Sequence, residues 1–225
     1  MKTKALIVLL IIAISLTGCA KIFNDDFEAD VVGNSPSLSP AGNPPDDALT
    51  VQGAPNSIIV INSSLLGSKA VKIDRTAMMP QTVLECVTGG GPYTSGNYLV
   101  AYRAYSLLVS DVPTLTTSIK SSGGQRAFEL TLTGGSYKLS SGDGLETLPG
   151  GYTANVVHVV LVRIDLSVDR FWLNIDGTDV ASEKPFLDSA FDSLHLLRFE
   201  YPPPILEALP GTYVIDDISI SKKKS

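Results

Sequence analysis

The chain has 225 residues, of which 44% are hydrophobic, and a formal net charge of −6 at pH 7. Aspartate and glutamate (23) outnumber lysine and arginine (17), and no basic stripe interrupts this balance, which argues against a nucleic-acid partner. The two cysteines and two histidines do not form a Cys/His cluster in the sequence, which argues against a zinc site.

The first residues are typical of a secretory signal. Lys2 and Lys4 precede an apolar run over residues 5–15, and this run covers only about half of a roughly 30 Å hydrocarbon core at about 1.5 Å per helical residue. The run ends in Leu-Thr-Gly-Cys at residues 16–19, which resembles the lipobox of bacterial lipoproteins. The resemblance implies a signal peptide over residues 1–18, an acyl (palmitate-type) anchor on Cys19 and a short tether over residues 19–22. The alternative is an ordinary signal peptide with a chance cysteine.

The lipobox resemblance also implies a place in the cell. Without Lys2 and Lys4 the net charge becomes −6 − 2 = −8, so the acyl chain has to supply the affinity for a membrane. Ala20 follows the cysteine in place of the aspartate that marks inner-membrane retention in enteric bacteria. We therefore expect an exported protein that is lipid-anchored to the cell envelope, with the outer membrane favoured.

After the tether the chain reads as many short strands. They are separated by turns rich in Gly, Pro, Asn and Asp, and none shows a sustained helical apolar stripe. We expect strands at residues 57–62, 70–74, 82–88, 97–108, 115–120, 126–133, 136–139, 145–148, 155–166, 170–175, 193–200 and 212–221.

Three local patterns carry more specific expectations. Residues 155–166 are apolar on both faces until Arg163, which predicts a central strand covered on both sides. Asp-Gly at residues 176–177 predicts a two-residue hairpin. Cys86 is expected to be a small buried hydrophobe, and His158 and His195, which stand among apolar residues, are expected to be core histidines.

Residues 162–166 and 170–177, together with the acidic opening at 25–28 and the closing strand at 213–220, resemble concanavalin A-like sandwiches of the laminin-G-like kind. The resemblance implies an all-β, two-sheet antiparallel β-sandwich (jelly roll) over residues 23–221, with paired termini and a basic tail at 222–225. Galactose-binding jelly rolls begin and end similarly, so the type of sandwich stays open.

Many members of such families bind polysaccharides or glycoproteins, or cleave glycosides. The glucanase arrangement of two glutamates flanking an aspartate on one strand is missing here, because Glu85, Glu129, Glu146 and Glu200 each stand alone on their strands. Separate strands could still supply a pair of carboxyls at the required spacing.

Aromatic and polar side chains on the strands suggest a sugar site. Sugars present apolar C–H faces and hydroxyl rims, which suit an exposed ring beside polar groups. The candidates are Trp172, Tyr98, Tyr102, Arg103 and Asn174. The alternative is that these rings cover the core.

The two ends of the domain suggest a metal. Asp216 alternates with Val214, Ile218 and Ile220, so a carboxylate appears on an apolar face, where it needs a cation or several N–H donors. Together with Asp26 and Glu28 it predicts a structural calcium site, since calcium prefers oxygen ligands. The alternative is hydrogen bonding to loop amides without metal.

The sequence therefore favours a membrane-anchored envelope lipoprotein whose non-catalytic sandwich binds carbohydrate or glycoconjugate. The alternatives are a structural or adhesion lipoprotein with a protein partner and, third, a glycoside hydrolase or lyase. Exposed aromatics would favour sugar, a flat apolar patch would favour protein, and facing carboxyls would favour an enzyme.

Overall fold

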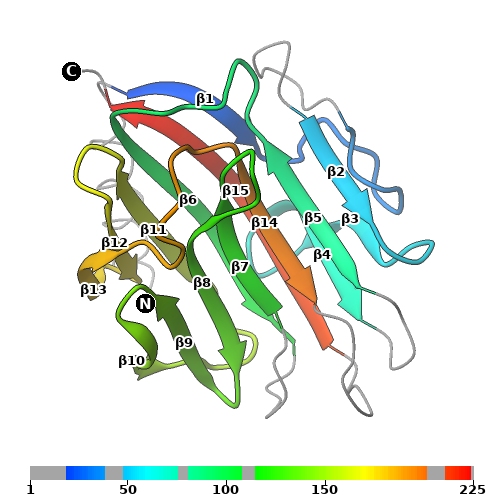
Figure 1. The fold of residues 1–225 in the computed structure, drawn as a ribbon. Coiled ribbons are helices and arrows are strands. Elements are labelled where there is room, and N and C mark those ends of the chain that lie inside the picture. The colour runs from blue at the N-terminus through cyan, green and yellow to red at the C-terminus, as the bar shows by residue number, and fades with distance from the viewer. Residues whose placement is uncertain (1–18, 39–47, 76–80, 108–114, 202–210, 224–225) are drawn as a thin grey trace.

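A computed structural model describes residues 19–38, 48–75, 81–107, 115–201 and 211–223. They form two antiparallel sheets packed face to face (Figure 1). Sheet A has the order β13-β12-β11-β6-β15-β4-β3, with β1 paired to β15 beside this path; sheet B has the order β10-β9-β8-β7-β14-β5-β2. The predicted all-β sandwich is confirmed. The expected signal peptide over residues 1–18 lies outside the described residues.

The strands of sheet A are β1 (Cys19–Asp25), β3 (Ile58–Ser63), β4 (Ser68–Arg75), β6 (Asn97–Ser106), β11 (His158–Asp165), β12 (Arg170–Ile175), β13 (Thr178–Pro185) and β15 (Gly211–Lys223). Those of sheet B are β2 (Ala48–Gln52), β5 (Thr82–Val87), β7 (Leu115–Lys120), β8 (Arg126–Thr133), β9 (Ser136–Ser141), β10 (Gly144–Gly151) and β14 (Leu196–Tyr201).

The core lies between the two sheets and is rich in aromatic rings. Phe128 of β8 stacks on Phe171 of β12 with ring centroids 5.1 Å apart, and the Tyr102 ring of β6 meets the Phe199 ring of β14 edge to face at 5.0 Å. Each such ring stabilises the fold by roughly 1.5–3 kcal/mol through burial. Cys86 is fully buried in this core, as predicted, and burial raises the pKa of its thiol.

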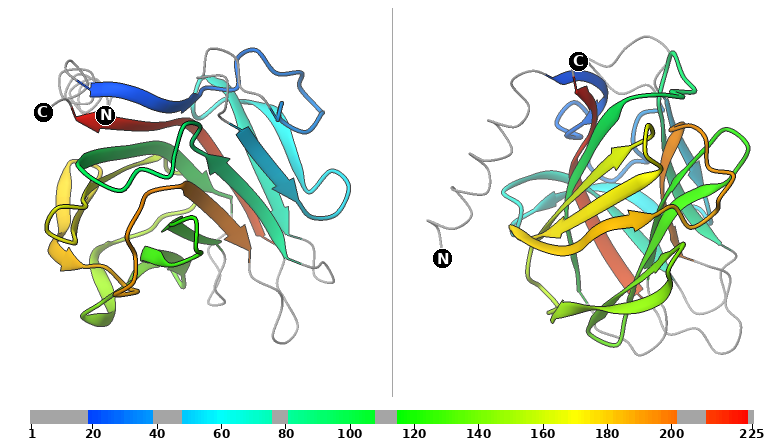
Figure 2. Two further views of the ribbon diagram at one scale, coloured as in Figure 1. Left: turned by 45° about the horizontal axis from the view of Figure 1, so that its top comes forward. Right: turned by 60° about the vertical axis from the view of Figure 1, so that its left-hand side comes forward.

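The chain termini meet in sheet A. β1 runs antiparallel to the last part of β15, with Cys19 opposite Lys223 and Asp25 opposite Ile218. The pairing of first and last strands, which the family resemblance implied, is therefore present (Figure 2). Within the described part of the chain no helix is long and apolar enough to cross a membrane.

The predicted hairpin at residues 176–177 connects β12 to β13. Asp176 and Gly177 both have positive φ angles, 54° and 83°, as a type I′ turn requires. Short polar Asp and Cβ-free Gly tolerate this backbone, so the local sequence specifies the turn.

β11 is a central strand between β12 and β6, as predicted, but it is not covered on both faces. Val160, Val162 and Ile164 point into the core, whereas Val159 and Leu161 point to the outside and are only half-buried. The apolar residues on the outer side had suggested a second covering layer. In the structure the neighbouring strands bury them in part.

β15 departs from the alternation expected around Asp216. Its register with β6 shifts between Asp216 and Ser219, and Asp217 has a φ of 52°. This bulge places Val214 in a small outer cluster, while Ile218 and Ile220 belong to the main core. Asp216 therefore does not share a face with Ile218 and Ile220, contrary to the simple two-residue period.

Candidate functional site

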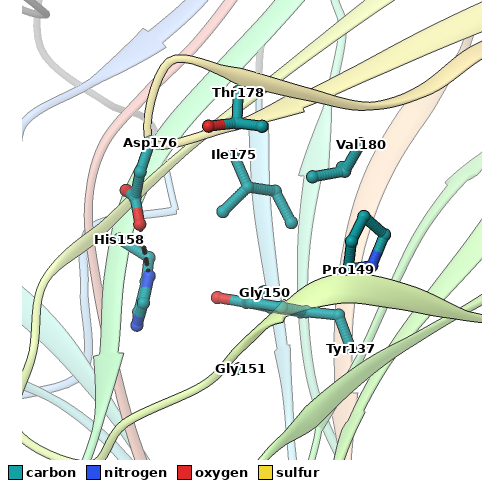
Figure 3. Close-up of a pocket in the computed structure, with 9 residues that line it drawn as sticks. All are labelled: Tyr137, Pro149, Gly150, Gly151, His158, Ile175, Asp176, Thr178 and Val180. Carbon is teal, nitrogen blue, oxygen red and sulfur yellow. Dashed lines mark hydrogen bonds and ion pairs between the residues drawn. The ribbon is translucent and has the colours of Figure 1, made fainter.

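A pocket of about 200 Å³ lies between an edge strand of sheet A and an edge strand of sheet B (Figure 3). β10 is the edge strand of sheet B and β13 is the edge strand of sheet A. The residues that line it come from β9, β10, β11, β12, β13 and the β12–β13 turn. They are Tyr137, Pro149, Gly150, Gly151, His158, Ile175, Asp176, Thr178 and Val180.

The pocket has an apolar interior and a polar rim. The side chains of Tyr137, His158 and Ile175 are buried, and Val180 is half-buried. Asp176 and Thr178 are exposed at the rim. The volume is below the roughly 300–1,000 Å³ of pockets for drug-sized ligands, so it suits one small ring.

His158 and Asp176 form a hydrogen-bonded pair in this pocket. The imidazole Nδ1 lies 2.7 Å from Asp176 Oδ2, and the backbone N–H of Val159 donates to Asp176 Oδ1 at 2.8 Å. The turn carboxylate thus fixes the ring of His158 and the backbone of the next residue together. The His158 side chain is 8% exposed and that of Asp176 is 44% exposed, so the pair connects the interior to the rim.

His158 packs among aromatic rings. Its centroid is 5.1 Å from that of Tyr152 and 5.8 Å from that of Tyr137. Burial raises the pKa of the Tyr137 hydroxyl well above its ordinary value, so this hydroxyl stays protonated. Within the described residues, His158 Nε2 and the Tyr137 hydroxyl are buried without a hydrogen-bond partner.

The Asp176 carboxylate sets the tautomer of His158. A carboxylate can only accept, so it favours a proton on His158 Nδ1 and leaves Nε2 as an acceptor in the neutral ring or a donor in the charged one. Protein atoms enclose both Nε2 and the Tyr137 hydroxyl, so the polar side chains that a ligand can reach are Asp176 and Thr178 at the rim.

The aromatic residues predicted from sequence do not gather at one site. Tyr98 and Tyr102 point into the core and are 1% and 2% exposed, so neither ring forms an exposed platform. Trp172 lies half-buried on the outer face of sheet A, with the Arg163 guanidinium carbon 4.2 Å from its ring centroid. The two tyrosines therefore fit the alternative, in which these rings cover the core.

The polar residues predicted for the same site have structural partners. Asn174 Nδ2 donates to Asp179 Oδ1 at 2.8 Å, and its Oδ1 accepts the Gly177 N–H at 2.9 Å, which supports the hairpin. Arg103 lies two strands away on β6 and pairs with Asp216 and Asp217 at 2.8 and 2.6 Å. Arg103, predicted to bind sugar, and Asp216, predicted to bind a metal, thus form an ion pair with each other.

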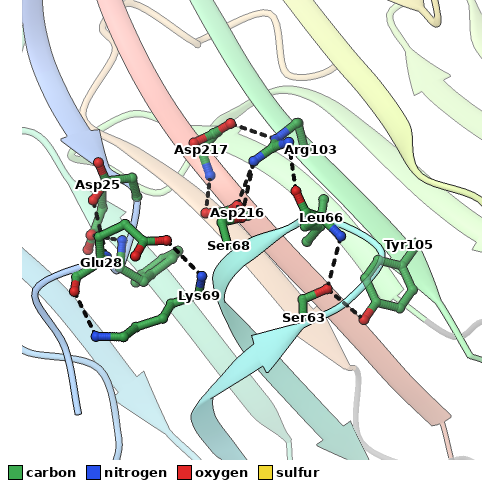
Figure 4. A network of polar contacts seen from close by, with 12 residues as sticks. Asp25, Glu28, Ser63, Leu66, Ser68, Lys69, Arg103, Tyr105, Asp216 and Asp217 are labelled. Atoms are coloured by element: carbon green, nitrogen blue, oxygen red, sulfur yellow. Dashed lines mark hydrogen bonds and ion pairs between the residues drawn. The ribbon is translucent and has the colours of Figure 1, made fainter. Parts of the chain in front are cut away.

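The residues predicted for calcium are held by protein donors (Figure 4). Asp216, fully buried, accepts from Arg103 Nη2 at 2.8 Å and from Ser68 Oγ at 2.5 Å. Glu28 Oε1 accepts the Lys69 N–H at 2.7 Å, and Asp26 Oδ1 accepts the Glu28 N–H at 3.2 Å. Among the described residues no group of three or more His, Cys, Asp or Glu is arranged to hold a metal, so calcium stays a prediction.

The same region contains a buried carboxylate that the sequence did not single out. Asp25 is 7% exposed; its Oδ1 accepts the Phe27 N–H at 2.9 Å, while its Oδ2 is buried without a partner in the described chain. Burial raises the pKa of Asp25 to about 7, with smaller contributions from nearby acids including Asp30 and Asp26. Burial likewise raises the pKa of Asp216 to about 6.

The isolated glutamates of the sequence are paired with cations. Glu85 and Glu200 both bind Arg198 on the outer face of sheet B, at 2.8 and 2.7 Å. Glu129 binds Arg126 at 3.0 Å, and in a separate ion pair Glu146 binds Lys184 at 2.9 Å. Each of these four carboxylates is thus paired with a cation.

Sequence reasoning missed the pocket pair. His158 was expected to be a core histidine, and Asp176 was noted only as a turn residue. The usable signal is the turn at residues 166–169, because it returns β12 antiparallel along β11 and so brings Asp176, which follows β12, beside the start of β11. The register between β11 and β12 was not readable from sequence.

No protein-family model matches the chain, and no curated protein matches it in sequence. Solved structures do resemble it. A sialidase matches with a TM-score of 0.62 and 12% identity over 78% of this chain and 17% of its own. The conserved carbohydrate esterase vb_24B_21 of the Shiga toxin-encoding bacteriophage phi24B matches with a TM-score of 0.60 and 16% identity over 92% of this chain and 100% of its own.

The third resemblance is to botulinum neurotoxin type C, whose cell entry depends on interaction with two ganglioside molecules. The TM-score is 0.62 and the identity 10%, over 92% of this chain and 49% of the toxin chain. The chain thus spans less than a fifth of the sialidase and about half of the toxin chain. At these identities the likeness establishes the β-sandwich fold alone.

Proposed function

We propose that this protein is a glycan-binding module that holds one sugar ring in the pocket between β10 and β13. The observation that carries the proposal is the combination of an apolar interior with the His158–Asp176 pair in a pocket of about 200 Å³. The similarity in fold to a sialidase and to a ganglioside-dependent toxin supports it.

The lining suits the two sides of a sugar ring. Tyr137, Ile175 and Val180 offer apolar surface to C–H groups, as aromatic and aliphatic walls do in many ligand sites. Asp176 and Thr178, exposed at the rim, offer a carboxylate and a hydroxyl to the sugar hydroxyls.

The charge of the lining favours an uncharged sugar. Asp176 is a carboxylate, and the nine lining residues include neither lysine nor arginine. A sugar acid would meet this carboxylate without a lysine or arginine in the lining to offset the repulsion, which makes binding less favourable. The ligand class that we propose is therefore a neutral terminal sugar.

The anchoring of the module belongs to the same proposal. Acylation of Cys19 would hold the module at the cell envelope, with the outer membrane favoured by Ala20. β1 starts at Cys19, so the acylated residue would be the first residue of a strand in sheet A. The tether expected over residues 19–22 is part of that strand.

Blocking the pocket tests the glycan proposal. Thr178→Tyr places a ring at the pocket rim, and Thr147→Tyr on β10 makes the same change at an exposed position outside the lining. On an array of neutral and sialylated glycans we expect the parent and Thr147→Tyr to bind the same neutral glycans. We expect Thr178→Tyr to lose at least tenfold in affinity.

Two outcomes would contradict the proposal. Equal binding by Thr178→Tyr and the parent would exclude this pocket, and exclusive binding of sialylated glycans would exclude the neutral ligand. Melting curves of both variants verify that the fold is retained.

A further inference from the structure

The proposed lipid anchor and a group of basic side chains lie at one end of sheet A. We call this end the anchor end: the start of β1 at Cys19, the end of β15 at Lys223, the start of β6 at Asn97, the end of β11 at Asp165 and the β11–β12 turn over residues 166–169. Strand pairing puts them together, since Cys19 lies opposite Lys223 and Asn97 lies opposite Asp165. Figure 2 shows the start of β1 beside the end of β15.

The anchor end is basic although the whole chain is acidic. Its cations are Lys21, Arg163, Arg170, Lys222 and Lys223. Its carboxylates are Asp165, Asp169 and, on the edge strand β13, Glu183. Ser167 donates to Asp165 through both Oγ and N–H, and these hydrogen bonds lower the pKa of Asp165, which stays ionised.

The same end carries apolar and aromatic surface on the outer face of sheet A. Strand registers give one row across five strands, which contains Lys21, Ser221, Leu99, Arg163 and Trp172. Leu99 and Trp172 are half-buried in this row. In the adjoining turn Val168 is 54% exposed.

This composition matches a membrane interface. Trp is enriched where headgroups meet acyl chains, and Arg and Lys place their stems along apolar surface while their charges reach phosphate. Arg163 already covers the Trp172 ring, so one aromatic–basic pair faces outward from the sheet. A single acyl chain anchors weakly, and a basic patch supplies a second attachment.

We propose that the anchor end rests on the headgroups of an anionic phospholipid bilayer and fixes the orientation of the domain. The position of Cys19 is the reason to expect a bilayer at this surface, because acylation there would bring the bilayer to Lys21 and Lys223 first. β11 has eight residues, so its two ends are about 23 Å apart at about 3.3 Å per residue. The His158 pocket at the other end would then face away from the membrane.

The inference rests on the proposed anchor, and Trp172 tests it directly because it is the sole tryptophan of the chain. The full acylated chain is extracted from bacterial membranes and reconstituted into vesicles of phosphatidylcholine, with or without phosphatidylglycerol, that carry a nitroxide label on the headgroup. We expect the label to quench Trp172 fluorescence at least twofold in anionic vesicles, and high salt to relieve much of this quenching.

Charge reversal supplies the matched control. Lys223→Glu changes the anchor end, and Lys138→Glu makes the same change on β9 of sheet B. We expect Lys223→Glu, and more strongly Lys222→Glu/Lys223→Glu, to reduce the quenching by at least half, while Lys138→Glu leaves it unchanged.

The possible failures are distinguishable. Flotation of an acylated chain whose Trp172 is not quenched would overturn the docking surface and leave the anchor standing. A chain that neither floats nor carries an acyl group would overturn both. Glycan binding is measured in a separate assay, so its failure is seen independently.

Discussion

The two ends of β11 and β12 have opposite surface chemistry. At the end that holds His158 and Asp176, apolar side chains line a small pocket beside this hydrogen-bonded pair. At the anchor end, Val168 and Arg170 are exposed, and Lys223 lies at the same end of sheet A on β15, which β6 separates from β11. The same pair of strands thus ends in a small pocket and in an open basic surface. Each end of a sheet in a two-sheet sandwich can therefore serve a separate partner.

The largest expected effect concerns the anchor end. Cys19→Ser should abolish acylation, because serine lacks the thiol that is acylated, and should remove the protein from the detergent-soluble membrane fraction as a mature species. Mass spectrometry and fractionation measure this. A mature, lipid-modified Cys19→Ser protein would contradict the assignment of Cys19 and with it the contrast between the two ends.

A second prediction concerns Asp25, the buried carboxylate at the end of β1. The pKa of Asp25 in the folded state, about 7, exceeds the ordinary value of 3.8, so the folded state binds more protons than the unfolded state. The stability contributed by protonated Asp25 is therefore fully present below about pH 4 and is lost as the pH rises through 7. Asp25→Asn should remove this loss, because the amide oxygen can still accept the Phe27 N–H.

We expect Asp25→Asn to raise the free energy of unfolding by up to about 4 kcal/mol at pH 8, at about 1.4 kcal/mol per pKa unit, and to change it little at pH 4. Urea unfolding at both pH values measures the difference. Asp26→Asn, at an exposed neighbour, is the control. Equal stability of Asp25→Asn and the parent at pH 8 would show that burial of the ionised Asp25 carboxylate does not destabilise the fold.

The third prediction compares the carboxylates at the two ends of β11. Asp176 holds both His158 and the Val159 N–H, whereas Asp165 accepts hydrogen bonds from Ser167. Asp176→Asn replaces the carboxylate beside His158 with a neutral amide, which weakens the hydrogen bond to Nδ1. We therefore expect a loss of about 1–3 kcal/mol in stability and weaker glycan binding. Asp165→Asn should cost about 1 kcal/mol and leave glycan binding unchanged. Thermal melts and glycan titration measure the effect of both substitutions. A larger loss of stability or of glycan binding in Asp165→Asn than in Asp176→Asn would contradict the prediction.

The last prediction concerns calcium at the joined termini. If Asp216, Asp26 and Glu28 bind calcium, a hundredfold excess over Kd should stabilise the fold by about 2.7 kcal/mol. At about 2–4 °C per kcal/mol this raises Tm by roughly 5–11 °C, and Asp216→Asn should remove the rise. Identical melting curves with calcium and with chelator would leave Arg103 and Ser68 as the partners of Asp216.

The amino-acid sequence alone predicts the class of fold and several local features. Short alternating segments predicted the strands, and Asp176-Gly177 predicted the hairpin, because period-two alternation and positive φ angles are properties of adjacent residues. The segment of residues 48–52 was not predicted to be a strand, yet it forms β2 at the edge of sheet B. Its side chains are mostly half-buried, so its alternation is weak.

Which face of each strand points inward, and which residues meet, depends on how the two sheets pack against each other. Tyr98 and Tyr102 share a face in sequence, but their burial depends on the sheet that packs against β6. One bulge at Asp217 reverses the parity of β15 and so separates Asp216 from Ile218. The pairs His158–Asp176 and Arg103–Asp216 depend on strand register, which is fixed by packing between distant segments and not by the residues beside them.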